Sequence, residues 1–276
     1  MAGRWEFPGG KVEAGETPRM ALARELEEEL GIEVLAARPL MRIHHEYPER
    51  AVLLDCWLVE QWAGEPTARE GHPLDWVQPT HLHDHDLLEA DLPLVGALML
   101  APRYAITRDG TPQQVLSQLE QLVSQGHSLI QLRTVHATAI AQEALFTCRA
   151  RGVRLLVNTD VSTAVALGFD GVHLNTARLM SLKRRTLPVG MLMAASCHNK
   201  AELSHAVDIG CDFAVLGPVA ATPSHPEITP MGWVAFASLA DGAGIPMYAL
   251  GGMREEYIEV AWEHHAQGIA GISAWS

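Results

Sequence analysis

Positive charge is scarce in this sequence: 20 Lys and Arg residues stand against 33 Asp and Glu, which gives a net charge of −13. Such an acidic surface disfavours duplex DNA and anionic membranes as partners, because both carry negative charge themselves. It does not disfavour a nucleotide held through a metal ion, since the cation supplies the positive charge. We therefore expect no nucleic-acid partner and no membrane partner.

Other features are missing as well. No apolar run reaches the length of a membrane span, and neither a secretory leader, a tandem repeat nor a low-complexity tract is recognisable. The four cysteines show no CxxC spacing, so reduced thiols and a cytoplasmic location are the expectation. With 276 residues and 48% hydrophobic content, the chain predicts a globular protein of one or two domains. Its oligomeric state stays open.

Residues 9–32, GGKVEAGETPRMALARELEEELGI, contain a helix with clear ends. Thr17 suits the N-cap and Pro18 the first helical position. We expect the helix to run to Leu30, with Gly31 as its left-handed stop. The leucines of this helix occupy one arc and can face a core: Leu22, Leu26 and Leu30.

Glu25, Glu28 and Glu29 share a different arc of that helix, about 100° wide. Three carboxylates so close repel one another, at a cost of a few tenths of a kcal/mol per pair. A divalent cation would reverse the sign, and hard oxygen ligands suit Mg²⁺ or Mn²⁺. The alternative is an ordinary solvated acidic face.

Further fixed positions favour the metal. The spacing G-x5-E-x7-R-E-U-x-E-E-x-G-U, with U aliphatic, is matched without a mismatch, and seven such coincidences have a chance of about 10⁻⁸ per window. The matching residues are Gly10, Glu16, Arg24, Glu25, Glu28, Glu29 and Gly31. This pattern resembles the Nudix box. The runs RWEFPGGKVEAGETP and LDCWLVEQWAGEPTAREGHPLDWV further resemble the MutT-type pyrophosphohydrolases.

The resemblance implies Mg²⁺-dependent hydrolysis of a nucleoside triphosphate to the monophosphate and pyrophosphate, with oxidised dGTP as the expected substrate. Glu25 or Glu28 would help to deprotonate the attacking water, and Arg24 would orient the glutamates. The implied metal ligands are the Gly9 carbonyl, Glu28, Glu29 and Glu70. The alternative for Glu70 is an ordinary loop carboxylate. The implied nucleotide contacts are Glu6, Phe7, Pro8, Gly9 and Asp91, the last replacing an amide that the family uses to read the purine.

Residues 33–43 and 51–62 carry strand-like apolar content, and residues 44–50 are predicted as the turn between them. The hairpin with which a Nudix sheet normally begins is absent, which is expected to leave an open sheet edge and an exposed apolar face. Either Met1 is internal to a longer chain or the domain lacks that hairpin. A histidine-rich run, 81–86, is interpreted as a polar loop, with a metal site as the alternative.

From Arg103 the pattern changes to short apolar runs alternating with helical stretches. The predicted strands are 103–107, 128–133, 153–158, 171–174, 191–197, 213–219, 246–251 and 268–273. Predicted helices include 112–124, 139–150, 200–208 and 254–265. Eight such strands in about 175 residues predict a compact (β/α)8 barrel whose last helix is missing. The fold class expected is thus α/β: an N-terminal α/β/α sandwich of α+β type over 1–98, then a TIM barrel over 102–276.

Ordered motifs in this second half resemble thiamine-phosphate synthase and its TenI relatives: Gln131-Leu132-Arg133, Val157-Asn158, 170–174, 217–219, Thr222-Pro223 and 249–253. The resemblance implies a phosphate site at Thr222, Gly251, Gly252 and Ser273. For the glycines, a tight turn is the alternative.

Departures from the family's pattern matter more. Its two Mg²⁺-binding aspartates fall at Thr159, beside Asp160, and at Arg178. The lysine that it has after the Gln-Leu-Arg run is absent, since Thr134-Val135 follows, and its second lysine is His225 here. We expect the barrel to bind a phosphorylated small molecule without making thiamine phosphate. Two alternatives stay open: a synthase- or thiazole-tautomerase-like enzyme of thiamine metabolism, and a non-catalytic module that binds a phosphate ester.

Overall fold

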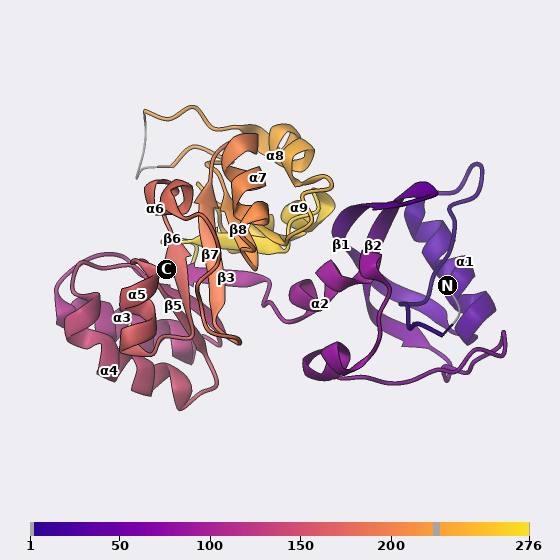
Figure 1. Ribbon diagram of the computed structural model, residues 1–276, viewed down its shortest axis with the longest axis horizontal. Coiled ribbons are helices and arrows are strands. Elements are labelled where there is room, and N and C mark those ends of the chain that lie inside the picture. The colour runs from indigo at the N-terminus through magenta and orange to yellow at the C-terminus, as the bar shows by residue number, and fades with distance from the viewer. Residues whose placement is uncertain (1–2, 223–226, 276) are drawn as a thin grey trace. The chain divides into compact units, whose positions relative to one another are not determined.

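The computed structural model describes residues 3–222 and 227–275. The chain divides into two compact units, which meet between Met99 and Leu100 and are treated separately below (Figure 1). Nowhere in those described ranges is a helix both long enough and apolar enough to cross a membrane.

The first unit consists of one helix, a long hairpin and a short C-terminal helix. The elements are α1 (Pro18–Leu30), β1 (Glu33–Tyr47), β2 (Arg50–Ala63), the 3-10 turns η1 (Pro79–Asp84) and η2 (Glu89–Asp91), and α2 (Leu92–Leu98). Helix α1 has its predicted bounds: the Thr17 hydroxyl accepts a hydrogen bond from the Met20 N–H, and Gly31 adopts φ 71°. Of the three leucines expected to face a core, only Leu26 is buried.

Strands β1 and β2 pair antiparallel from Glu33↔Ala63 to Tyr47↔Arg50. The predicted turn at 44–50 is therefore wrong, because residues 44–47 continue β1 and the turn comprises Pro48 and Glu49 alone. Within the described residues, the sheet of this unit consists of these two strands. One part of the sheet packs on α2 in a small core of Leu40, Met41, Ile43, Leu94 and Ala97, whereas Leu35 and Leu53 are more than half exposed.

The second unit is a closed barrel of eight parallel strands in the order β10-β3-β4-β5-β6-β7-β8-β9, so the predicted TIM barrel is confirmed. The strands are β3 (Arg103–Ile106), β4 (Leu129–Leu132), β5 (Arg154–Val157), β6 (Gly171–Leu174), β7 (Leu192–Cys197), β8 (Phe213–Leu216), β9 (Met247–Ala249) and β10 (Gly268–Gly271). Each lies within a predicted strand. Large side chains such as Tyr104, Phe213 and Tyr248 fill the interior.

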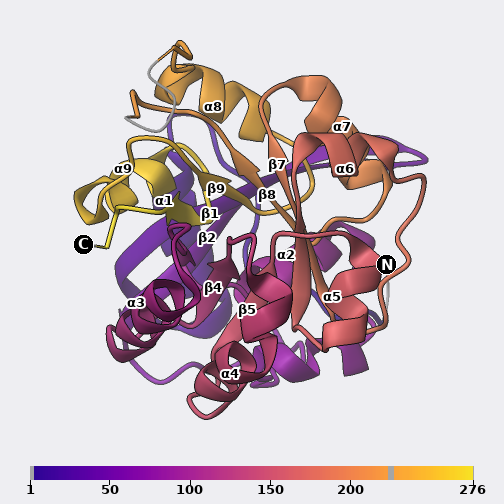
Figure 2. The same ribbon diagram turned by 90° about the vertical axis from the view of Figure 1, so that its left-hand side faces the viewer.

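Helices surround these strands (Figure 2). They are α3 (Pro112–Ser124), α4 (Ala137–Arg149), α5 (Val161–Leu167), α6 (Thr176–Ser181), α7 (Lys200–Asp208), α8 (Gly232–Ala240) and α9 (Ile258–Glu263), the last preceded by the 3-10 turn η3 (Glu255–Tyr257). Helices α3 and α7 have the predicted bounds. The predicted helix 254–265 is divided into η3 and α9, and residues 264–265 lie outside it.

Candidate active site

The Arg24 side chain organises the acidic face of α1. Its Nε and Nη2 donate to the two carboxylate oxygens of Glu16 at 2.8 and 3.0 Å. Its Nη1 donates to Glu25 at 3.0 Å and to Glu28 at 3.3 Å, and Nη2 also reaches the Lys11 carbonyl at 3.0 Å. Five N–H groups thus make five hydrogen bonds within the protein. Arg24 therefore positions carboxylates and has no donor left for a substrate.

The glycine-rich loop before α1 presses against the same carboxylates. The Gly9 N–H donates to Glu29 at 3.1 Å. A Cβ atom on Gly10 would lie 2.1 Å from the Glu25 carboxylate, so a side chain at this position would displace that carboxylate. The loop therefore contacts Glu25 and Glu29, and Glu25 is also held by Arg24 of the helix.

The loop that carries Glu70 is attached to the C-terminal end of α1. The Arg69 N–H donates to the Glu29 carbonyl at 2.9 Å, and the Arg69 guanidinium donates to the Glu27 carbonyl at 3.0 Å. The first bond satisfies the Glu29 carbonyl at the helix end, and the second adds to the Gly31 N–H that already donates to the Glu27 carbonyl. The arginine also covers Gly31, where a Cβ would meet it at 2.4 Å. This role of Arg69 was not predicted from the sequence. The feature that could have indicated it is its positive charge, which favours the C-terminal end of a helix.

Negative charge accumulates around Glu29. Burial raises the pKa of Glu29, and the nearby charges of Glu70, Glu25 and Glu6 raise it further against the opposing Gly9 N–H. Within the described ranges, no three His, Cys, Asp or Glu side chains, residues 81–86 included, already form a metal cage. Mg²⁺ commonly takes only one or two carboxylates, completing its shell with water and substrate phosphates. Glu29, with Glu70 near it, therefore supplies as many carboxylates as such an ion takes.

In the barrel, Gly251 and Gly252 follow β9 with φ 96° and 66°. Cβ atoms on them would lie 2.5 Å from Pro218 and from the Ala221 carbonyl respectively. Close packing of the two loops therefore suffices to require glycine at both positions. Thr222 ends the described part of the loop after β8, whereas Pro223 and His225 lie outside the described residues, and Ser273 is exposed after β10.

An arginine and an aspartate lie at the mouth of the barrel above β5 and β6. The Arg178 Nη1 donates to the Asn158 side-chain oxygen at 3.1 Å. Asp160, the carboxylate nearest to the lost metal-binding position, caps α5 instead, accepting from the Thr163 N–H at 2.9 Å and its hydroxyl at 2.7 Å. The hydrogen bond from the Ser162 hydroxyl, together with these two from Thr163, holds the pKa of Asp160 well below its usual range. This carboxylate is thus already committed to the helix.

Family models match both units: residues 1–97 match the NUDIX domain and residues 103–275 match thiamine monophosphate synthase. An 8-oxo-dGTP diphosphatase of Escherichia coli (strain K12) is 43% identical over 98 residues, which are 36% of this chain and 76% of that protein. The chain belongs to both families. Its first unit is a Nudix hydrolase.

Two further relatives concern the barrel. The thiamine biosynthesis bifunctional protein ThiM/ThiE of Symbiobacterium thermophilum is 33% identical over 181 residues, 62% of this chain and 36% of that longer one. The thiamine phosphate pyrophosphorylase from Pyrococcus furiosus shares the fold at a TM-score of 0.51 and 21% identity, covering 62% of this chain and 85% of that one.

Asp91 of the Nudix unit is buried beside the glycine-rich loop. The Phe7 N–H donates to its carboxylate at 3.4 Å. Burial raises the pKa of Asp91 to about 6, the Phe7 N–H opposes this, and the charge of Glu6 adds to it. Near neutral pH this carboxyl can therefore accept hydrogen bonds when ionised or donate one when protonated.

Asp91→Asn is expected to stabilise the Nudix unit more at pH 8 than at pH 4. Because folding raises the pKa of Asp91, the proton stabilises the fold below the unfolded value near 4, and this contribution is lost as the pH rises through about 6. The gain at pH 8 should be about 1–2 kcal/mol. Urea unfolding at both pH values measures it.

Asp84→Asn is the matched control for that measurement, because Asp84 is 63% exposed. It should leave the pH dependence unchanged. Equal behaviour of the two variants would contradict the role of burial.

A small cavity of about 130 Å³ lies next to this segment, lined by Arg4, Glu6, Tyr47, Arg50 and Leu88. The Arg50 guanidinium stands 5.9 Å above the Tyr47 ring. Since a typical ligand pocket measures about 300–1,000 Å³, the cavity accommodates only part of a nucleotide. Tyr47 and Arg50 were expected in a turn, so this contact between ring and cation was not predicted. The two residues are paired across the strands at the tip of the hairpin, and only that pairing brings them together.

Proposed function

We propose that the Nudix unit hydrolyses a nucleoside triphosphate to the monophosphate and pyrophosphate with Mg²⁺, and that 8-oxo-dGTP is its substrate. The observation that carries this proposal is the hydrogen-bond set of Arg24, which fixes Glu25 and Glu28 on one face of α1. The Glu70 loop adjoins the end of the same helix. The similarity to the 8-oxo-dGTP diphosphatase of Escherichia coli supports the choice of substrate.

The residues that would hold the metal are Glu28, Glu29, Glu70 and the Gly9 carbonyl. The ion would supply positive charge against the phosphates and lower the pKa of bound water. Glu25 or Glu28 would accept the proton from the attacking water. Arg24 would keep both carboxylates in place, while Glu16 anchors Arg24 from the loop.

The base would lie beside Glu6, Phe7, Pro8, Gly9 and Asp91. In this arrangement the Asp91 carboxyl would contact the purine edge in place of an amide. Its pKa of about 6 supports base selection that changes between pH 5 and pH 7.

Pyrophosphate release, measured over a panel of nucleoside triphosphates with and without Mg²⁺, tests this proposal. We expect release that requires the cation and is fastest with 8-oxo-dGTP. Release that is equal in EDTA would contradict the metal, and a preference for another nucleotide would contradict only the substrate.

For the barrel, we propose that it binds a phosphate ester without Mg²⁺ and does not form thiamine phosphate. Arg178 carries the positive charge at the mouth, and Asp160 is occupied as a helix cap. Of the Arg178 guanidinium, only the bond to Asn158 is made within the described residues. Its other N–H groups, with Thr222, Gly251, Gly252 and Ser273, would contact the ester.

Inorganic phosphate is expected to bind this protein in EDTA, and Arg178→Met should weaken that binding by about tenfold. Arg184→Met removes an equal charge elsewhere on the barrel and serves as the control. Calorimetric titration measures both. Formation of thiamine phosphate by the purified protein would instead favour the synthase alternative.

A further inference from the structure

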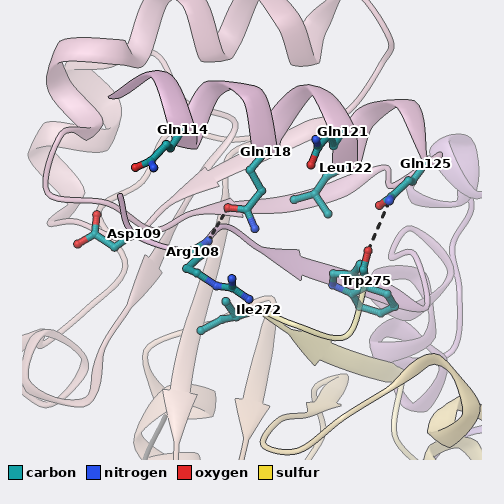
Figure 3. Close-up of a pocket in the computed structure, with 9 residues that line it drawn as sticks. All are labelled: Arg108, Asp109, Gln114, Gln118, Gln121, Leu122, Gln125, Ile272 and Trp275. Atoms are coloured by element: carbon teal, nitrogen blue, oxygen red, sulfur yellow. Dashed lines mark hydrogen bonds between the residues drawn. The ribbon is translucent and has the colours of Figure 1, made fainter. Parts of the chain in front are cut away.

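A cavity of the barrel unit lies next to the proposed ester site, because two of its lining residues, Ile272 and Trp275, flank Ser273 in the sequence. It measures about 370 Å³ and lies between α3 and the segments that follow β3 and β10. Four glutamines, three of α3 and one at its C-cap, form one wall, at spacings of four, three and four residues that place them on one face of the helix. They are Gln114, Gln118, Gln121 and Gln125 (Figure 3).

Two of these amides have a fixed orientation. The Gln118 side-chain oxygen accepts from the Arg108 N–H at 2.8 Å, and the Gln114 oxygen accepts from the Thr111 N–H at 2.9 Å. A backbone N–H can only donate, so in each amide the oxygen is occupied and the NH₂ group is left as the donor. The wall therefore offers donors to a ligand that is rich in acceptors.

The opposite wall supplies a positive charge. Arg108 follows β3, and its guanidinium has no ion-pair partner in the described part of the chain. The neighbouring Asp109 is occupied elsewhere: it accepts from the Gly110 N–H at 3.1 Å, and a hydrogen bond from Thr134 lowers the pKa of Asp109. Asp109 stays ionised but is held by these hydrogen bonds, so Arg108 is the charged side chain of the cavity that is available to an anionic ligand.

Trp275 adds a flat apolar surface. Its indole N–H donates to the Gly271 carbonyl at 3.0 Å, and its ring packs edge-to-face with His127 at 4.7 Å between centroids. Leu122 and Ile272 line the cavity nearby (Figure 3). A ring held in this way offers a surface on which a planar heterocycle can stack.

We propose that this cavity binds a phosphorylated planar heterocycle of mononucleotide size. The phosphate pairs with Arg108, the ring lies against Trp275, and the Gln114 and Gln118 amides donate to acceptors on the ligand. A volume of about 370 Å³ lies in the range of small-molecule pockets. This inference is independent of the reaction proposed for the Nudix unit.

The indole ¹H–¹⁵N signal of Trp275 tests the proposal directly, in the full chain and in EDTA. Comparison with Trp275→Phe identifies the signal. Guanosine monophosphate is expected to shift it in a saturable manner, and Arg108→Met should weaken this binding by about tenfold. Arg151→Met, an equal loss of charge on an exposed arginine that does not line the cavity, should leave the affinity unchanged.

Separate titrations with guanosine and with inorganic phosphate measure how much the heterocycle and the phosphate each contribute to binding. Each should bind more weakly than the monophosphate. No shift of the Trp275 signal at about 5 mM ligand, equal weakening by both arginine variants, or equal affinity for phosphate alone would each overturn the proposal. Binding at the Nudix unit would not produce a shift that depends on Arg108.

Discussion

Glu28→Gln is expected to reduce Mg²⁺-dependent pyrophosphate release by about 10³-fold, because loss of a catalytic acid–base group costs about 10²–10⁴-fold in rate. The substitution keeps the shape of the side chain and removes its charge. In our proposal Glu28 is both a metal ligand and a candidate for accepting the proton from water. Its carboxylate is half exposed and lies 3.3 Å from Arg24, so it is available to a ligand. Stopped-assay kinetics over a Mg²⁺ titration would show a fall in kcat and weaker metal dependence.

Glu27→Gln is the matched control for that experiment. Glu27 is the preceding residue of α1 and is exposed, and Arg69 uses only its backbone carbonyl. The same charge is thus removed from the same helix outside the proposed site. We expect Glu27→Gln to retain nearly full activity with an unchanged Mg²⁺ requirement. If Glu28→Gln were as active as Glu27→Gln at every Mg²⁺ concentration, the proposed metal site would be abandoned.

The parts of this structure that could be predicted from sequence depend on local signals. Thr17, Pro18 and Gly31 define the ends of α1 through a side-chain cap and a positive φ, which act within a few residues. The barrel strands are short apolar runs that become fully buried, as in β4 and β8. Their pattern is distinct because a parallel barrel is covered on both faces.

What could not be predicted depends on contacts between distant residues. Residues 44–47 extend β1 without an apolar period, because the tip of the hairpin is largely exposed and its side chains are polar. Arg69 donates to a carbonyl of α1 that is 42 positions away in the sequence, and the Asp91 carboxyl accepts from the Phe7 N–H, 84 positions away. Burial of Asp91, and with it the raised pKa, follows from tertiary packing and not from any neighbour in the sequence.

The role of Asp160 in the barrel could also not be predicted from the sequence. In the sequence it is a carboxylate next to a lost metal-binding position and could replace the missing ligand. In the structure its oxygens accept four hydrogen bonds at the start of α5, two from Thr163 and one each from Ser162 and Thr159. An aspartate followed by serine and threonine is also a helix-capping signal. Residue type alone therefore did not decide between the two roles.

Arg24→Met is expected to reduce kcat by about 10–100-fold while KM changes little, since a positioning residue acts through groups that contact the substrate. The five hydrogen bonds of Arg24 join Glu16, Glu25, Glu28 and the Lys11 carbonyl. Without them the carboxylates would repel one another and take up several orientations. Arg24→Lys keeps the charge but offers three donors without the planar fork, so it should restore part of the rate.

A second measurement distinguishes this role from a general loss of stability. Hydrogen bonds from Arg24 and from the Glu13 N–H lower the pKa of Glu16 to about 2. The stabilisation from ionised Glu16 is therefore present above its unfolded value near 4.5 and is lost as the pH falls toward 2. In Arg24→Met the pKa of Glu16, followed by ¹³C NMR of its carboxyl, should rise toward 4.5. In Arg19→Met, which removes an exposed arginine of the same helix, the pKa and the rate should stay as they are. A fall in kcat without a change in the pKa of Glu16 would show that Arg24 acts on the reaction by another route.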